Sequence, residues 1–239
     1  MRMKQLVMGA LMAACGDTVP SQTTVQVERL TALELQVVDH DSDYMRRVHA
    51  HVGSERTGAL DPAARGAGVS AHEDVWQIGD TAHRVGHDFY LEATNRGTVT
   101  GRTQLEGYFA QLTNNPSFIV PLGHELAFEQ SEPGRWRSYY LHEPIVLDGN
   151  AVINAEVDDR GERLVVLADL SDAAARTFGQ VTSQIVGGKL AILSDGVVVS
   201  APIINDQIWG GTFAITMGSD NGDENLDAAK ALAAKLDRD

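Results

Sequence analysis

Apolar residues recur along the start of this chain in patterns typical of short strands and helices. In residues 32–39, ALELQVVD, apolar positions alternate with polar ones, which predicts a half-buried strand. Residues 40–52 change to a helical period. Ser42 or Asp41 is the expected N-cap of this helix. Its apolar face is expected to consist of Tyr44, Met45, Val48 and Val52.

The rest of the first half alternates between loop, strand and helix signals. Residues 53–70 are rich in glycine and alanine and predict a long surface loop. A strand is predicted at 87–95. A helix is predicted at 101–112, with a shared face of Leu105, Tyr108, Phe109 and Leu112. Two more strands are predicted on either side of the turn Glu132-Pro133-Gly134, at 124–131 and 135–143.

The pattern becomes sharper from residue 151 onward. Two alternating segments, 151–158 and 162–170, flank a polar turn and predict a hairpin. Ser171 caps a helix that continues to about residue 186. The apolar positions of this helix are three or four residues apart, so they share one face: Ala174, Phe178, Val181 and Ile185.

A second hairpin is predicted from residues 189–193 and 197–201. Asp195-Gly196 joins the two strands, because glycine adopts positive φ freely and Asp-Gly closes tight turns. A further strand is predicted at 211–218 and a closing helix at 223–236, whose inward residues are Leu226, Ala229, Ala233 and Leu236. Strands mixed with helices and joined by hairpins predict an α+β fold, with a mostly antiparallel sheet and helices packed on one face.

The chain is long enough for one large domain or two small ones, since it has 239 residues and 43% hydrophobic content. We expect two subdomains, divided between Pro144 and Asn150. The first is an α+β region at 31–145 and the second is the better patterned region at 146–239. Residues 16–30 are polar and read as a tether.

The charge of the chain excludes one class of partner. The formal net charge is −14, and no cluster of lysine or arginine offsets it. Such a surface repels the phosphates of nucleic acids, so we expect no binding of DNA or RNA.

The chain opens with a targeting signal, MRMKQLVMGALMAACGD. Two cations precede a short apolar stretch that is too short to span a bilayer but fits a signal peptide at residues 1–15. The ending LMAAC resembles the lipobox of bacterial lipoproteins, which implies lipidation at Cys15. We therefore expect an extracytoplasmic protein held at a membrane by a lipid anchor. The alternative is an ordinary signal peptide with an incidental cysteine.

Motifs of catalysis and of cofactor binding are weak in this sequence. Gly188-Lys189 ends a helix and begins a strand, the reverse of the order in a phosphate-binding loop, and no G-x-S-x-G motif is present. The serines examined as nucleophiles, Ser183, Ser194 and Ser200, lack obvious partners. The carboxylates Glu156, Asp158, Asp159 and Asp169 fit turns and solvated strand faces. We predict no enzymatic activity and no cofactor.

The histidines also give weak signals for a metal site. His83 and His87 are four residues apart, and His49 and His51 two apart, but Gly86 interrupts the first pair and neither pair has a partner glutamate in the motif. Asp39, His40 and Asp41 lie at a strand-to-helix junction where caps are ordinary. We predict no metal site. The chain has three tryptophans, Trp76, Trp136 and Trp209. Trp209 fits equally well an exposed residue that contacts a partner and a residue at the edge of the core.

Residues 170–218 resemble the head subdomain of the first periplasmic domain of SecD and of the fused SecDF proteins, which are subunits of the bacterial preprotein translocase. The matching pieces follow the family order: the capped helix with Phe178 and Thr182, then LAI (190–192), Asp195-Gly196, SAPII (200–204), Ile208, Gly210-Gly211 and ITMG (215–218). AKALAAKL (229–236) is similar to the family's closing helix. The start, LELQVVDHDSDYM (33–45), resembles more loosely a base subdomain.

The resemblance implies a binding role without chemistry. In the family this region faces the extracytoplasmic side and is proposed to hold emerging preprotein. An exposed sheet edge or groove would take an extended polypeptide by strand addition. The residues that we expect to carry such binding are Asp195, Gly196, Ser200, Ala201, Pro202, Asn205, Trp209, Gly210 and Gly211.

We therefore expect a lipid-anchored accessory of protein translocation or secretion. Its expected partners are preprotein, another envelope protein or components of the Sec translocase. One alternative is a structural or assembly lipoprotein of the cell envelope that reuses the fold. A second alternative is an enzyme with a His/Asp site near His40, His49, His83 and His87.

Overall fold

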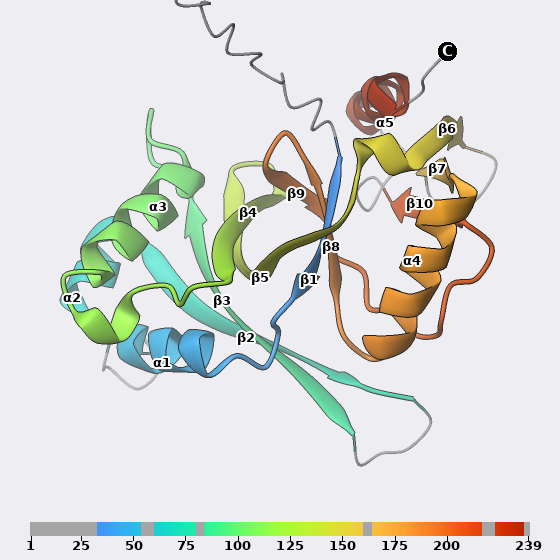
Figure 1. Cartoon of the computed structure of the whole chain (residues 1–239). Coiled ribbons are helices and arrows are strands. Elements are labelled where there is room, and N and C mark those ends of the chain that lie inside the picture. Colours follow the sequence, from blue (N-terminus) through green and yellow to red (C-terminus); the bar gives the residue numbers. More distant parts are fainter. Residues whose placement is uncertain (1–32, 54–59, 80–83, 160–163, 217–222, 237–239) are drawn as a thin grey trace, which may run out of the picture.

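The computed structural model describes residues 33–53, 60–79, 84–159, 164–216 and 223–236 (Figure 1). Within them, helices pack on two sheets whose strand pairs are almost all antiparallel. The α+β prediction is therefore confirmed.

The larger sheet of the described residues has seven strands in the order β1-β8-β9-β4-β5-β3-β2. Their bounds are β1 Glu34–Val38, β2 Val69–Gln77, β3 Val85–Thr94, β4 His124–Glu132, β5 Arg135–Asp148, β8 Leu190–Ser194 and β9 Val197–Ser200. Strand β1 also pairs with β5, so that β1, β8, β9, β4 and β5 form a closed ring. The β4–β9 contact is parallel. Neighbouring strands in this ring can lie more than 100 residues apart in the sequence, as β1 and β5 do at Glu34 and Asp148.

Strand β5 is long enough to serve two partners along one edge. Its first residues pair with β3, through Arg135, Trp136 and Arg137. Its last residues pair with β1, and a register shift separates Leu141 from Ile145. Pro144 lies in this irregular stretch, where a missing backbone N–H is tolerated. The expected division between Pro144 and Asn150 therefore falls at the end of a continuous strand.

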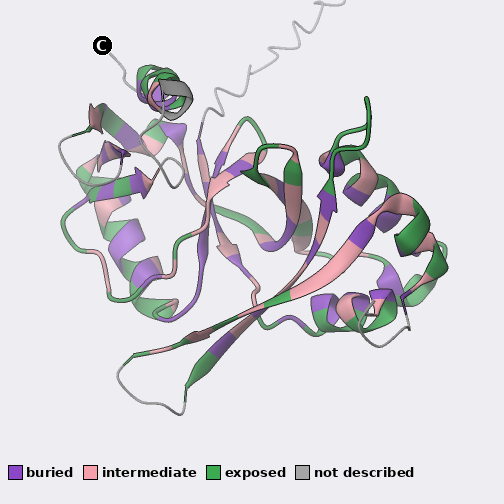
Figure 2. Ribbon diagram, turned by 180° about the vertical axis from the view of Figure 1, so that it is seen from behind, coloured by how far each residue is buried: buried purple, intermediate pink, exposed green. Residues whose placement is uncertain are grey.

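Three helices cover the part of the sheet made by β2, β3 and β5: α1 Asp43–Val52, α2 Pro62–Ala67 and α3 Gly101–Leu112. The Oγ of Ser42 accepts hydrogen bonds from the backbone N–H groups of Tyr44 and Met45, as the N-cap prediction requires. The predicted apolar faces of α1 and α3 are both buried. Figure 2 shows these buried faces turned toward the sheet, whereas the far end of the β2–β3 hairpin projects beyond the helices.

The prediction of a loop at 53–70 is wrong over its second part. Residues 62–67 form α2, and β2 begins at Val69. Asp61 caps the helix by accepting a hydrogen bond from the backbone N–H of Ala64 at 3.1 Å, and Pro62 occupies its first turn. Gly68 ends it with φ of 70°. Proline and glycine therefore mark the ends of a short helix here, while residues 54–59 lie outside the described structure.

The smaller sheet of the described residues has the order β10-β7-β6, with β6 Val152–Asp158, β7 Val165–Leu170 and β10 Thr212–Thr216. Helices α4 Asp172–Gln184 and α5 Asp223–Leu236 pack with it. Leu35 of β1 and Ile192 of β8 join the same core, which also includes Phe178 and Phe213. Short 3₁₀ helices complete the chain at Pro116–Phe118 and Gly149–Ala151. The predicted hairpins and both helices are confirmed.

Two stacked tyrosines are expected to make the stability of the protein depend on pH in the alkaline range. The rings of Tyr44 and Tyr140 are 4.9 Å apart, and the Tyr44 hydroxyl donates to the carbonyl oxygen of Phe118 at 3.1 Å. Burial raises the pKa of Tyr44 to about 12, with a further contribution from Tyr140. Burial, followed by the charge of Asp39, raises the pKa of Tyr140 to about 12.

We expect the stability contributed by these tyrosines to be complete below pH 10.0, the ordinary pKa, and to be lost as the pH rises toward about 12. The sign follows because the unfolded state releases the protons first. Chemical denaturation at a series of alkaline pH values measures this loss, and Tyr44→Phe should make it less steep. Difference titration that shows both phenols ionising at the ordinary pKa in the folded protein would contradict the prediction.

Candidate functional site

The predicted binding residues lie at two places along the segment 195–211: the turn between β8 and β9, and the stretch from the end of β9 to the start of β10. Asp195 and Gly196 form the tip of the β8–β9 hairpin with φ values of 50° and 73°, which confirms the predicted tight turn. Ser200 ends β9, and the remaining residues lie on the connection to β10: Ala201, Pro202, Asn205, Trp209, Gly210 and Gly211.

A groove of about 560 Å³ lies between this connection, α4 and β10. Three of the predicted residues, Pro202, Asn205 and Trp209, line it. Asp195, Gly196, Ser200, Ala201, Gly210 and Gly211 are not among its lining residues. Asp195 instead contacts Lys235 of α5 through its carboxylate. The volume falls within the usual range of ligand-binding clefts.

Apolar side chains from distant parts of the chain form the floor of the groove. Phe178 of α4 and Phe213 of β10 contact each other with ring centroids 5.4 Å apart. Leu35, Leu190 and Ile192 complete this floor from β1 and β8. Trp209 lies at the groove with 73% of its surface exposed. An exposed ring beside an apolar floor favours the interpretation of Trp209 as a contact residue.

Hydrogen bonds hold the connection from β9 to β10 in place on its β8 side. The backbone N–H of Leu190 donates to the carbonyl oxygen of Pro202 at 3.1 Å, and Ile204 N–H donates to that of Gly188 at 2.9 Å. Pairing thus resumes beyond β9 and includes a bridge between Lys189 and Ile203. Pro202, which lacks a backbone N–H, takes part in this resumed pairing through its carbonyl oxygen.

Helix α4 holds the other side of the same connection. The Oγ1 of Thr182 accepts a hydrogen bond from Ile208 N–H at 3.0 Å, and the Gln207 side chain donates to the Gly179 carbonyl oxygen at 2.7 Å. Thr182 is fully buried, which the apolar pattern of α4 did not predict. The groove is therefore bounded by a segment that is fixed on both sides.

The backbone of β10 is open on the groove side. Among the described strands, β10 pairs with β7 alone. Leu170 N–H donates to the Gly211 carbonyl oxygen, and the register places Thr212 opposite Asp169 and Ala214 opposite Leu167. In an antiparallel pair the hydrogen-bonded positions alternate, so the N–H and C=O groups of Thr212 and Ala214 point away from β7. Both residues also line the groove.

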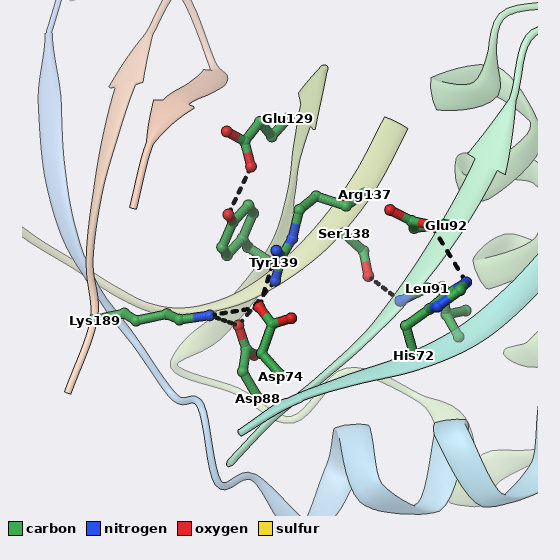
Figure 3. A network of polar contacts seen from close by, with 10 residues as sticks. All are labelled: His72, Asp74, Asp88, Leu91, Glu92, Glu129, Arg137, Ser138, Tyr139 and Lys189. Carbon is green, nitrogen blue, oxygen red and sulfur yellow. Dashed lines mark hydrogen bonds and ion pairs between the residues drawn. The ribbon is translucent and has the colours of Figure 1, made fainter. Parts of the chain in front are cut away.

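A charged cluster connects the β2–β3 hairpin to the start of β8 (Figure 3). Asp74 and Asp88 are direct cross-strand partners, an arrangement that is unfavourable for two like charges. Lys189 compensates by donating to Asp88 at 2.6 Å and to Asp74 at 3.1 Å, and Arg137 donates to each aspartate at 3.1 Å. The side chains of Asp88 and Lys189 are only 4% and 7% exposed.

The cluster perturbs the pKa of two of its members. Burial opposes ionisation of Asp74, but Arg137 and Lys189 outweigh it and hold the pKa of Asp74 below its ordinary value. Burial also disfavours the charge of Arg137, whereas Tyr139 and the two aspartates raise its pKa. Sequence reasoning missed the cluster. The one available signal is the pairing of Asp74 with Asp88 in a hairpin whose register the sequence does not reveal.

A serine, a histidine and a glutamate that the sequence did not single out lie close together on β2 and β3. Ser70 Oγ lies 2.8 Å from His72 Nε2, and Glu92 approaches that same nitrogen at 3.3 Å. A Ser-His-acid relay needs the hydroxyl and the acid on different ring nitrogens. Ser183 donates to the Gln180 carbonyl oxygen. Asp169, one of the four carboxylates considered in the sequence, accepts hydrogen bonds from the side chains of Thr212 and Asn154 on a sheet surface.

Two of the four histidines of the predicted alternative enzyme site, His49 and His87, contact the same ring, that of Phe89. His40 contacts Trp76, His49 contacts Phe89, and His87 pairs with Glu73. His83 lies outside the described residues. The indole N–H of Trp76 donates to the Gly187 carbonyl oxygen, and Trp136 packs against the core beneath the first three helices.

The family model described as SecDF, P1 head subdomain, matches residues 125–238. Residues 125–238 are a SecD P1 head-like domain. The SecD-like match begins in β4, before the expected boundary at 146. It includes every residue that lines the groove except Leu35, and it includes Arg137 and Lys189 of the charged cluster.

Curated relatives agree with this assignment. The chain is 31% identical over 118 residues to protein translocase subunit SecD of Rickettsia felis, covering 49% of this chain and 22% of the relative. It is 35% identical over 165 residues to SecD of Rhodobacter capsulatus, covering 64% of this chain and 29% of the relative. The latter match is longer than the head-like domain and therefore also includes residues before 125. The chain spans less than a third of the length of these relatives.

Solved structures of SecDF proteins are also similar to this chain. One, of a membrane component SecDF that enhances protein export, aligns over 85% of this chain and 92% of that chain, with 15% identity and a TM-score of 0.35. Another, from Thermus thermophilus, aligns over 85% of this chain and 29% of that chain, with 19% identity and a TM-score of 0.33. These values are too low to add to the assignment of the SecD head-like domain.

The predicted membrane anchoring depends on residues other than those of the groove. None of the helices in the described residues has the length and apolar character needed to cross a bilayer. Cys15, the predicted lipidation site, lies outside the described residues.

Proposed function

We propose that this chain binds extended polypeptide segments as an accessory of protein translocation, on the extracytoplasmic side of a bacterial membrane, with Cys15 as its lipid anchor. The observation that carries the proposal is the groove along the open edge of β10 within a SecD P1 head-like domain. Preprotein is the proposed ligand, and components of the Sec translocase are the proposed partners.

The groove combines the two features that strand addition requires. Outward N–H and C=O groups at Thr212 and Ala214 can pair with the backbone of any extended chain, whatever its sequence. The floor around Phe178 and Phe213 can accept apolar side chains from alternate positions of that chain. Such a combination suits an unfolded secretory protein, which exposes both backbone and apolar side chains.

The remaining part of the chain would support this domain. We propose that residues 31–145 act as a base-like region, and that the 146–239 part carries the ligand. One SecD match extends to residues before 125, which supports a SecD-like character for part of this first region. The charged cluster of Asp74, Asp88 and Lys189 would then join the β2–β3 hairpin of the base-like region to the groove-bearing part.

The direct test is photocrosslinking in cells. A crosslinking amino acid at Asn205 or Trp209 is expected to capture unfolded secretory protein or a Sec component, because both positions line the groove. Arg65, an exposed residue of α2, is the distal control. Capture at Asn205 and Trp209 no greater than at Arg65 would refute the proposed function.

A substitution in β10 tests the mode of binding. Ala214→Pro removes one outward N–H donor and leaves the pairing with β7 in place, so capture at Asn205 is expected to fall about tenfold, the effect of one lost hydrogen bond. Ala214→Val is the matched control, since it keeps the N–H group and should leave capture near the unsubstituted level. Equal capture by the two variants would show that the ligand does not pair with β10.

A further inference from the structure

Three side chains with metal-ligating groups converge where β1 ends and β4 begins. Asp39 follows β1 directly, and His124 is the first residue of β4. His142, in β5, is the cross-strand partner of His124. One ligand atom from each residue lies within 4.8 Å of the other two. The sequence did not suggest this group, because more than 80 residues separate Asp39 from His124.

Backbone and ring contacts hold the three residues in position. The N–H of Asp39 donates to the Tyr140 carbonyl oxygen at 2.9 Å, which fixes the end of β1 against β5. The His124 ring stacks on Tyr140 with centroids 4.7 Å apart and an interplanar angle of 1°. The rings of His124 and His142 are also 4.7 Å apart. A ligand set held by packing in this way loses little conformational freedom when it binds an ion.

The ring of His124 has an unusual deficit of hydrogen bonds. Both of its nitrogens are shielded from solvent, yet neither forms a hydrogen bond within the described structure. Asp39 Oδ2 lies 3.3 Å from Nε2, in ion-pair range. Buried polar atoms almost always have a partner, and a coordinated ion is one way to provide it.

We propose that Asp39, His124 and His142 form a binding site for a divalent transition-metal ion, with zinc as the fitting metal. Two imidazole nitrogens and one carboxylate oxygen match the donors that zinc takes in proteins, whereas magnesium and calcium prefer oxygen ligands throughout. Tetrahedral zinc with bonds of about 2.1 Å needs ligand atoms roughly 3.4 Å apart, which small side-chain rotations can reach from the observed spacing. A water molecule would complete the coordination.

The position of the site gives it a structural consequence. Asp39 belongs to the end of β1, and the histidines belong to the paired strands β4 and β5. Strand β1 closes the ring by pairing with β5. An ion held by all three would cross-link this closure, and it could enter from the side of Asp39, whose side chain is 32% exposed. An ion that binds the folded state and not the unfolded state would raise the stability of the protein.

Zinc titration of the chelator-treated full chain tests the site. We expect binding of one zinc ion by calorimetry and a rise in melting temperature. Asp39→Asn keeps the size of the side chain and removes its negative charge, and His142→Ala removes a ligand. Each is expected to weaken zinc binding at least tenfold. His87→Gln is the matched control, since His87 pairs with Glu73 on another strand pair, and it should bind zinc as the unsubstituted chain does.

Cobalt provides a readout that does not depend on stability. The visible absorption of bound cobalt reports a four-coordinate site, and it should be lost in Asp39→Asn, whose folding is checked by circular dichroism. Absence of zinc binding by the chelator-treated chain would overturn the proposal. Equal zinc affinity in Asp39→Asn and the unsubstituted chain, or tighter binding of magnesium than of zinc, would overturn it as well.

Discussion

Replacing Asp88 with asparagine is expected to lower the free energy of unfolding by about 3–5 kcal/mol. The side chain of Asp88 is 4% exposed and accepts hydrogen bonds from Lys189 at 2.6 Å and from Arg137 at 3.1 Å. Without its charge, two buried cations would share Asp74 alone among the described partners of the cluster. Urea denaturation of the variant and the unsubstituted protein measures the difference.

A second substitution separates charge imbalance from simple loss of contacts. Lys189→Met in the Asp88→Asn background restores a neutral cluster, with Arg137 facing Asp74, so the double variant should be more stable than Asp88→Asn alone. Asp195→Asn is the control for an exposed pair: it breaks the contact with Lys235 and should change stability by less than about 0.5 kcal/mol. If Lys189→Met destabilises the Asp88→Asn protein further, the two charges do not compensate each other as the geometry indicates.

Replacing Phe178 with alanine is the second large effect, with an expected loss of about 3–5 kcal/mol in the free energy of unfolding. Phe178 is 1% exposed and packs in the core that α4 shares with the smaller sheet and with β1 and β8. Its contact with Phe213 is one side of the groove floor. The neighbours are held by strand pairing on several sides, so the cavity left by the ring cannot collapse fully.

The same helix provides the control for this change. Gln180 is exposed on α4, and Gln180→Ala should alter stability by less than about 0.5 kcal/mol while keeping the helix intact. In Phe178→Leu the leucine fills part of the space left by the ring, so the stability of this variant should lie between those of Phe178→Ala and Gln180→Ala. Thermal unfolding of the three variants gives their order, and a Phe178→Ala protein as stable as Gln180→Ala would show that α4 is not packed as described.

Much of the local structure followed from the sequence. The capping hydroxyl of Ser42, the apolar spacing in α1 and α3, and the Asp195-Gly196 turn all act within a few residues, so the pattern contains the information needed to place them. Helix α2 was missed because it is short and bounded by Pro62 and Gly68, residues that also favour loops. The resemblance to SecD named Thr182, but the apolar pattern did not predict its burial, because a hydroxyl that accepts from Ile208 N–H has the polarity of a surface residue.

The candidate sites depended more strongly on distant contacts. Pro202, Asn205 and Trp209 were predicted as binding residues through resemblance to SecD and do line the groove. The floor of the groove includes Leu35 of β1 and Phe213 of β10. These residues are far apart in the chain, so no local sequence pattern could predict that they line the same groove. The metal-ligating group of Asp39, His124 and His142 forms because β1 ends against the start of the β4–β5 pair.

The sequence by itself determined the secondary structure of the second half, the α+β class and the likeness to a SecD head, since these depend on periodicity, caps and turns between near neighbours. The tertiary structure alone decided how the strands close into a ring, which edge stays open, and which charges and histidines meet. Strand pairing joins residues far apart in the chain, and its register depends on the whole core being buried at once.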